Sequence, residues 1–269
     1  MKTLRFATIA ALSASILAGG AVSAFANESR STETDNTVTF TANEEEENEV
    51  EPPVTEPEVG PIEPTPPGQT GPLTLAYVSP TFDFGQQVIS AQDQVYSMIA
   101  EEQTQTATGD LVPYVSFAQV IDTRGTHDGW TLSVDLTDFA SEESNHTLTG
   151  AQIEFVSPDI VYNGDDAERT PTAAKNNGDS LFLNVGQDDV VVMNANDGQG
   201  AGRSSIVWGD QLDLNEQAEE NEEGQAVLNH GIRLHVPGST TQDAAQYNAT
   251  MTWSLSSVAD GEGETIPEP

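Results

Sequence analysis

The chain has 269 residues, of which 44 are acidic and 8 are basic, and its formal net charge at pH 7 is -36. So negative a surface repels nucleic acid and anionic membranes, and we expect the protein to bind neither. The absence of cysteine excludes disulfides, thiolate zinc sites, a cysteine nucleophile and a lipidated N-terminal cysteine, so the fold depends on core packing alone.

Residues 1–26 have the features of a secretory signal peptide. Lys2 and Arg5 form the positive start, an Ala-rich apolar run follows, and Ala24 and Ala26 supply the small-x-small cleavage site. A retained membrane anchor is the alternative, but the apolar run is short for a span. We therefore predict cleavage after Ala26 and export of a mature chain that does not insert into the membrane.

Residues 27–70 have the composition of a disordered linker. Residues 44–47 are four consecutive glutamates, whose like charges resist compaction. Residues 51–67 mix proline with acidic residues, which favours extended polyproline II structure and leaves little apolar surface to bury. The segment is either a spacer that holds the domain away from a surface or a tail that tolerates processing. It resembles the Pro/Glu-rich stalks of cell-wall-associated proteins.

Residues 71–259 are predicted to form one all-β domain, which an acidic tail follows over residues 260–269. Apolar and polar residues alternate in several short runs, and Gly, Asn, Asp and Pro lie in the turns between them. The pattern contains no convincing helix, so we expect an antiparallel β-sandwich or barrel-like domain. The predicted strands cover residues 73–78, 111–121, 130–136, 148–155, 181–185, 190–193, 204–214, 231–236 and 247–255.

Three segments of this domain are less regular. Residues 88–100 fit either a strand or a short helix, and their Gln, Ser and Val content favours the strand. Pro113 interrupts the strand region around it and predicts a sheet edge or a bulge. Residues 216–224 are predicted to be an acidic loop without a core-facing side.

Residues 247–255 give the strongest strand signal in the chain. Tyr247, Trp253 and Leu255 share one face of an extended strand with an Ala and a Met, while Asn, Thr and Ser occupy the other face. Such strict alternation is typical of a strand with one buried and one solvent-exposed side. The exposed Asn and Thr residues are further candidates for ligand contact.

A second Trp-x-Leu step lies in residues 130–136, where Trp130 and Leu132 share a face with a Val and a Leu. The tryptophans of both strands have two possible roles, which are stacking on a sugar ring or partner and packing in the core. Core packing is favoured because each Trp alternates in phase with aliphatic residues. The sequence leaves open whether the two strands are neighbours and whether Trp208 is a core or a rim residue.

Arg124 is another candidate contact residue, because it lies in the turn that precedes the first Trp strand. Its planar guanidinium suits bidentate pairing with the carboxylate of a peptide ligand. The alternative, which we favour, is an internal ion pair with Asp122 in a chain that has few cations.

These stretches together resemble the motifs of WxL-domain surface proteins of Gram-positive bacteria, and the resemblance covers residues 73–258. A single Trp-x-Leu step carries no information, but two of them with matching flanks in a secreted β domain do. The matching stretches are residues 73–75 (LTL), 82–85 (FDFG), 120–125 (VIDTRG), 129–134 (GWTLSV) and 247–255 (YNATMTWSL).

The resemblance implies non-covalent attachment to the bacterial cell surface through a domain that binds peptidoglycan. It also implies partner surface proteins, including one with a membrane span, and in some members adhesion to host matrix proteins. This chain departs from the larger members in having only the acidic stalk upstream and no second adhesive domain, so we do not expect an independent adhesive activity. The candidate ligand-binding residues are Arg124, Trp130, Leu132, Tyr247, Trp253 and Leu255.

Other features agree with a binding protein rather than an enzyme. The C-terminus carries no apolar tail with a basic end, and without cysteine there is no lipobox, so we expect non-covalent attachment. The residues show no catalytic triad or metal-ligand spacing, and residues 165–166 and 194–198 resemble only incomplete Ca²⁺ loops. We expect no cofactor, with Ca²⁺ as a minor alternative. The alternative function is a subunit of a multi-protein surface adhesion complex whose domain mainly binds proteins.

Overall fold

The computed structural model describes residues 37–42, 49–63, 70–143, 146–222 and 224–257. The predicted signal peptide and the predicted acidic tail lie outside the described residues. The chain divides into one unit over residues 1–39 and a second over residues 40–269, and the second contains every helix and strand described below.

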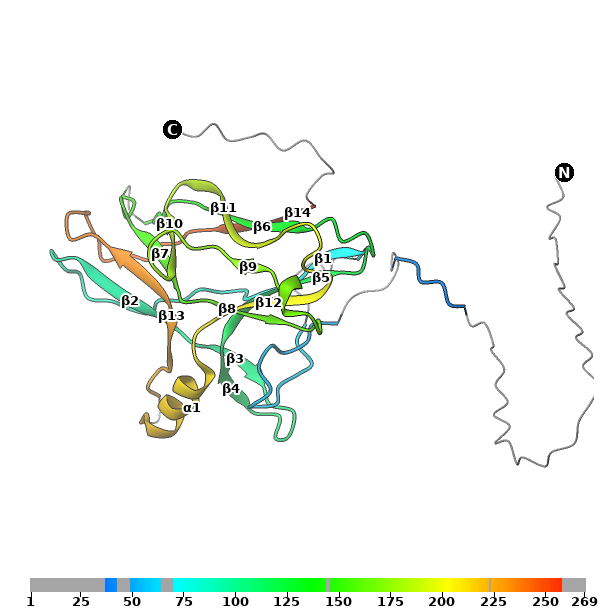
Figure 1. The fold of residues 1–269 in the computed structure, drawn as a ribbon. Coiled ribbons are helices and arrows are strands. Elements are labelled where there is room, and N and C mark those ends of the chain that lie inside the picture. The colour runs from blue at the N-terminus through cyan, green and yellow to red at the C-terminus, as the bar shows by residue number, and fades with distance from the viewer. Residues whose placement is uncertain (1–36, 43–48, 64–69, 144–145, 223, 258–269) are drawn as a thin grey trace, which may run out of the picture. The chain divides into compact units, whose positions relative to one another are not determined.

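The second unit is built from antiparallel strands in several sheets, which confirms the all-β prediction (Figure 1). The first sheet contains, in spatial order, β1 (Leu73–Val78), β5 (Ser116–Asp122), β12 (Gly202–Trp208) and β8 (Asp159–Tyr162). The second contains β10 (Ser180–Asn184), β7 (Gln152–Val156), β13 (Leu228–Val236) and β2 (Gln94–Ile99). The third contains β14 (Met251–Ser257), β6 (Trp130–Leu136), β11 (Gln187–Ala195) and β9 (Thr172–Ala173). A two-stranded sheet pairs β3 (Glu101–Thr104) with β4 (Leu111–Tyr114).

The main hydrophobic cluster draws residues from all three four-stranded sheets. Its largest members, including Trp130, Trp208 and Phe155, are fully buried. Each large apolar side chain buried in this way stabilises the fold by about 1.5–3 kcal/mol relative to its exposed state. The cluster therefore ties the three sheets into one domain, with no disulfide to assist.

Two of the irregular segments behave as predicted. Residues 88–100 contain a strand, β2, rather than a helix, although the strand begins only at Gln94. Pro113 lies in β4, which among the described residues pairs with β3 alone, so the proline is at a sheet edge where its missing N–H is tolerated.

The prediction that the domain has no helix is wrong. Residues 204–214 do not form one strand, because β12 ends at Trp208 and α1 (Gln211–Glu220) begins after Gly209, whose φ is +107°. The side chain of Asp210 caps the helix by accepting a hydrogen bond from the N–H of Leu212 at 2.9 Å. A short 3₁₀ helix, η1 (Ala167–Arg169), is also present.

The predicted acidic loop over residues 216–224 is also wrong in its first half, which belongs to α1. Leu214 of this helix is fully buried in a second hydrophobic cluster. The amide of Gln211 fixes the helix start, since it donates to the carbonyl of Pro113 at 2.9 Å and accepts from the N–H of Val115 at 3.0 Å. Because Leu214 is the one buried apolar residue of α1 among acidic and amide residues, the helix has no clear hydrophobic period of 3.6 residues, and the sequence does not reveal it.

Residues 49–63 pack against the domain, although the sequence assigns them to a disordered linker (Figure 1). Val50, Val59 and Ile62 are 9%, 5% and 6% exposed and belong to the second cluster. Backbone hydrogen bonds join Gly60 to the end of β3, since its N–H donates to the carbonyl of Thr104 at 3.0 Å. The remaining parts of the predicted linker, residues 27–36, 43–48 and 64–69, lie outside the described residues.

Candidate functional site

The two Trp-x-Leu strands are neighbours in the third sheet. β14 pairs with β6 in antiparallel register, with Trp253 opposite Val134 and Leu255 opposite Leu132. Segments more than a hundred residues apart thus meet in one ladder, which answers the question that the sequence left open.

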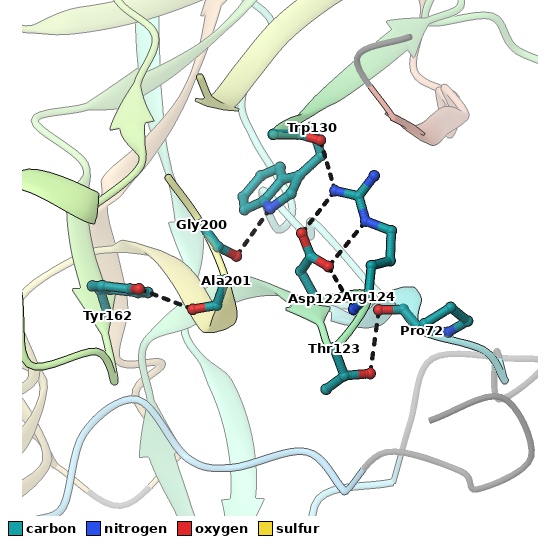
Figure 2. Close-up of polar contacts among 9 residues, drawn as sticks. Pro72, Asp122, Thr123, Arg124, Trp130, Tyr162, Gly200 and Ala201 are labelled. Atoms are coloured by element: carbon teal, nitrogen blue, oxygen red, sulfur yellow. Dashed lines mark hydrogen bonds and ion pairs between the residues drawn. The ribbon is translucent and has the colours of Figure 1, made fainter. Parts of the chain in front are cut away.

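Trp130 and Leu132 are core residues, because each has no exposed surface. The indole N–H of Trp130 donates to the carbonyl of Gly200 at 3.1 Å, so its one polar atom is satisfied inside the protein (Figure 2). Gly200 has φ +73°, and a Cβ there would lie 2.6 Å from the indole nitrogen. The loop glycine and the tryptophan therefore depend on each other, and neither residue of this Trp-x-Leu step is available to a ligand.

Trp253, by contrast, is half-buried and packs on the edge of an aromatic cluster. Its ring centroid lies 5.9 Å from that of Trp208 and 6.4 Å from that of Phe155, and these two stack on each other at 4.6 Å. Trp208 is fully buried, so it is a core residue and not a rim residue. Tyr247 and Leu255 are also half-buried.

Trp253 and Tyr247 line a cavity of about 600 Å³ beside β14, which we call the edge cavity. Its other walls come from Leu75 and Val78 of β1, from residues 79–82, and from Phe84 and Phe139. None of its lining residues is charged.

A second cavity of about 940 Å³ lies next to it, and we call it the aromatic-amide cavity. The two share several lining residues, among them Phe82, Phe84, Phe139, Tyr247 and Asn248. The aromatic-amide cavity adds amides, carboxylates and a further ring, namely Gln86, Gln87, Gln242, Gln246, Asp83, Glu143, Asp243 and Tyr96.

The walls of the aromatic-amide cavity are held by local hydrogen bonds. The side-chain carboxylate of Asp83 accepts a hydrogen bond from the N–H of Gly85 at 2.8 Å. The backbone carbonyl of Asp83 accepts one from the N–H of Ile99 at 2.7 Å. The hydroxyl of Tyr247 accepts from the N–H of Asp243 at 2.8 Å. The turn at residues 82–85 and the start of the Tyr247 segment, which both line this cavity, are therefore each held in place by hydrogen bonds.

Such a lining suits carbohydrate and peptide groups. Aromatic faces provide apolar area for the C–H side of a sugar ring, and amides both donate to and accept from hydroxyl and amide groups. Residues 82–85 and 247–255 could be identified as motifs in the sequence, but no sequence pattern marked Tyr96, Phe139 or Gln242 as candidate ligand-binding residues. These reach the cavity from a strand and two connecting segments, and their positions follow no period.

The outer face of β6 and β14 is a second exposed polar surface. Thr252 and Ser254 are exposed on it, opposite Asp135 and Ser133 of β6. The hydroxyl of Thr131 donates to the side-chain oxygen of Asn194 at 3.0 Å, so part of the face is bound internally. Neither Ser133 nor Ser254 of this face lines either of the two cavities described above, so the face is the weaker candidate for ligand binding.

Arg124 and Asp122 form an ion pair inside the domain (Figure 2). The guanidinium donates to both carboxylate oxygens, at 2.7 and 3.0 Å, and to the carbonyl of Gly129 at 2.7 Å. The side chain of Asp122 is 1% exposed and that of Arg124 14% exposed. The hydrogen bond to Asp122 raises the pKa of Arg124, so the charge is present throughout the accessible range. This geometry favours the internal ion pair over contact with a peptide carboxylate.

Replacing Arg124 with Ala is expected to lower the free energy of unfolding by about 2 kcal/mol, because it leaves the buried carboxylate of Asp122 with only a backbone donor. Chemical denaturation followed by circular dichroism would measure the loss. Arg169→Ala is a suitable control, since the Arg169–Asp166 pair is half-exposed and 3.5 Å apart, and its removal should change stability by well under ~1 kcal/mol. Equal stability of both variants would contradict a structural role for Arg124.

Two of the histidines lie beside carboxylates. His235 lies 2.7 Å from Glu154, and His146 lies 2.6 Å from Asp243. Within the described ranges, no three His, Cys, Asp or Glu side chains gather as a metal site. In the same part of the chain, no helix has the length and apolarity that crossing a membrane requires.

Comparison with known proteins identifies one family. The family model described as "WxL domain surface cell wall-binding" matches residues 27–258, which is nearly the whole chain. No significant match was found among curated proteins or among solved structures. The description is that of a binding domain at the cell surface and not of an enzyme. On the extent of this match, the chain belongs to the WxL family of surface cell wall-binding domains.

Proposed function

We propose that the protein is exported and attaches non-covalently to the cell wall by binding peptidoglycan in the aromatic-amide cavity. The observation that carries the proposal is that residues 82–85 and 247–248, from opposite ends of the domain, line this one cavity together with four glutamines. Family membership supports attachment to the wall in general. The lining of the aromatic-amide cavity supports this cavity as the place where peptidoglycan binds.

The chemistry of the cavity matches that of peptidoglycan. The rings of Phe82, Tyr96 and Tyr247 offer faces for N-acetylated sugars, whose C–H surfaces are apolar. The amides of Gln86 and Gln246 can exchange hydrogen bonds with acetamido and peptide groups. Several such neutral contacts are needed, because a chain with a net charge of -36 gains nothing from long-range attraction to an anionic surface.

Replacing Gln86 and Gln246 together with Ala is expected to weaken binding to purified peptidoglycan about tenfold, since each amide hydrogen bond contributes roughly 0.5–1.5 kcal/mol. Both side chains are exposed, so the fold should not change. Sedimentation of the protein with insoluble peptidoglycan measures the affinity. Gln225→Ala is the matched control, because Gln225 is equally exposed but lies after α1, away from the cavity.

Two outcomes of this experiment have different meanings. If the unaltered chain does not sediment with peptidoglycan, the proposed function is wrong. If it sediments and the double variant sediments equally well, peptidoglycan binds elsewhere, with the outer face around Thr252 as the next surface to alter. Repeating the assay with a chelator and with high salt separates divalent bridging, which both weaken, from stacking and hydrogen bonding.

A further inference from the structure

Among the described residues, β14 is the end strand of its sheet, and one of its two edges is open. The strand order of the third sheet is β14-β6-β11-β9, and β14 pairs with β6. Within the described part of the chain, no strand pairs with its outer edge.

The register shows which backbone groups point outward. Thr250 exchanges hydrogen bonds with Thr137, its carbonyl accepting from the Thr137 N–H at 3.0 Å and its N–H donating to the Thr137 hydroxyl at 2.8 Å. In an antiparallel ladder every second residue faces the partner strand, so the next residues to face β6 are Thr252 and Ser254. The N–H and C=O groups of Met251, Trp253 and Leu255 therefore point to the open edge.

Two other end strands among the described residues, β10 and β9, offer less edge than β14 does. The β10 edge is covered by Asn176, whose side chain accepts from the N–H of Phe182 at 2.8 Å and donates to its carbonyl at 2.8 Å. β9 has only two residues. β14 has seven residues and no charge, proline or register shift, which are the devices that normally protect an edge from another strand.

The edge cavity runs beside this open edge. It is lined by Thr250, Met251, Thr252 and Trp253 together with Leu75 and Val78 of β1. Its uncharged lining is unusual in a chain that has 44 acidic residues among 269. An extended segment along β14 would find main-chain partners on one side and apolar walls for its side chains.

We propose that the open edge of β14 binds an extended segment of another polypeptide as an added strand, with apolar side chains at alternate positions in the edge cavity. Main-chain hydrogen bonds supply affinity in this mode, and the pockets for alternate side chains supply specificity. The segment is neutral or basic, because an acidic one would be repelled by a chain with a net charge of -36. The same repulsion opposes a second copy of this chain as the occupant.

The first test uses a synthetic library of capped nonapeptides with Val, Ile, Leu or Phe at alternate positions and Thr, Ser or Lys between them. Selected peptides are added to the full chain, and amide hydrogen exchange is measured by NMR. We expect exchange at Met251, Trp253 and Leu255 to slow at least about tenfold, and exchange at Thr252 and Ser254, already bonded to β6, to change less. A library in which Lys is replaced by Glu should yield weaker binders.

A pair of substitutions isolates the main-chain contribution. Met251→Ala and Met251→Pro both remove the methionine side chain, but only proline removes the outward N–H, and β14 keeps its bonds to β6 in both. We expect the proline variant to bind the selected peptides about tenfold more weakly than the alanine variant.

Three results of the peptide experiments would overturn the proposal. They are the absence of any binder in the neutral and basic library, binding without slower exchange at the outward amides, and equal affinity of two folded Met251 variants. If the proline variant does not fold, the exchange measurement on the unaltered chain still decides. Slower exchange at these amides with peptidoglycan but not with peptides would also overturn it, and would assign the edge to the wall instead.

Discussion

A chain that begins at residue 71 is expected to be less stable than one that begins at residue 49, by roughly 3 kcal/mol in the free energy of unfolding. The shorter chain lacks Val50, Val59 and Ile62, which are buried in the second cluster. Each contributes about 1.5–3 kcal/mol on burial, and the cost of ordering an extended segment offsets part of that sum.

The same truncation removes the partners of buried polar groups. The hydroxyl of Tyr114 donates to the carbonyl of Val54 at 2.6 Å and accepts from its N–H at 3.0 Å. Burial raises the pKa of Tyr114 to about 12, so the hydroxyl keeps its proton and both hydrogen bonds at any physiological pH. The amide of Gln119 donates to the carbonyl of Glu51 at 2.7 Å and accepts from its N–H at 3.0 Å.

Urea denaturation of chains beginning at residues 27, 49 and 71 tests this expectation. The first two should have the same midpoint, while the third should unfold at lower urea and with a smaller m-value, because it buries less surface. Coincident curves for all three would show that residues 49–63 contribute nothing. The result also matters for wall-binding assays. If a chain that begins at residue 71 binds weakly, its lower stability could be the cause instead of a missing ligand site.

This segment shows where sequence reasoning succeeds and where it stops. The strands β6 and β13 could be predicted because alternation at period 2 records which side is buried. Val50, Val59 and Ile62 follow no period among prolines and acids, since an extended strap makes contact wherever its course allows. The burial of such a segment depends on the surface beneath it, which the local sequence does not contain.

The candidate site, too, could be predicted from the sequence only in part. The stretches at residues 82–85 and 247–255 could be identified as motifs, and alternation correctly indicated that Trp130 packs in the core. Alternation did not separate Trp130 from Trp253, because it reports the side of a strand and not whether that strand lies inside the sheet or at its edge. Pairing order decides this, and it arises from contacts between residues far apart in the chain.

Replacing Trp130 with Ala is expected to lower the free energy of unfolding by about 4 kcal/mol, the usual cost of removing a fully buried tryptophan and leaving a cavity. Trp253→Ala is the matched comparison, because it makes the same change in the neighbouring strand at a half-buried position. It should cost about 2 kcal/mol, since part of that ring is already in contact with solvent. Trp130→Phe should cost about 1 kcal/mol or more, because the carbonyl of Gly200 loses its donor.

Urea denaturation followed by circular dichroism measures all three losses, and peptidoglycan sedimentation of the folded variants measures the function separately. Trp130 touches neither cavity and Trp253 lines only the edge cavity, so both folded variants should keep wall binding while the Gln86/Gln246 variant loses it. A Trp130→Ala protein with unchanged stability and no wall binding would make Trp130 a contact residue and contradict its place in the core. The expected result would place the first Trp-x-Leu step in the core of the sheet and the second at its open edge. Wall binding would then depend on residues outside both steps.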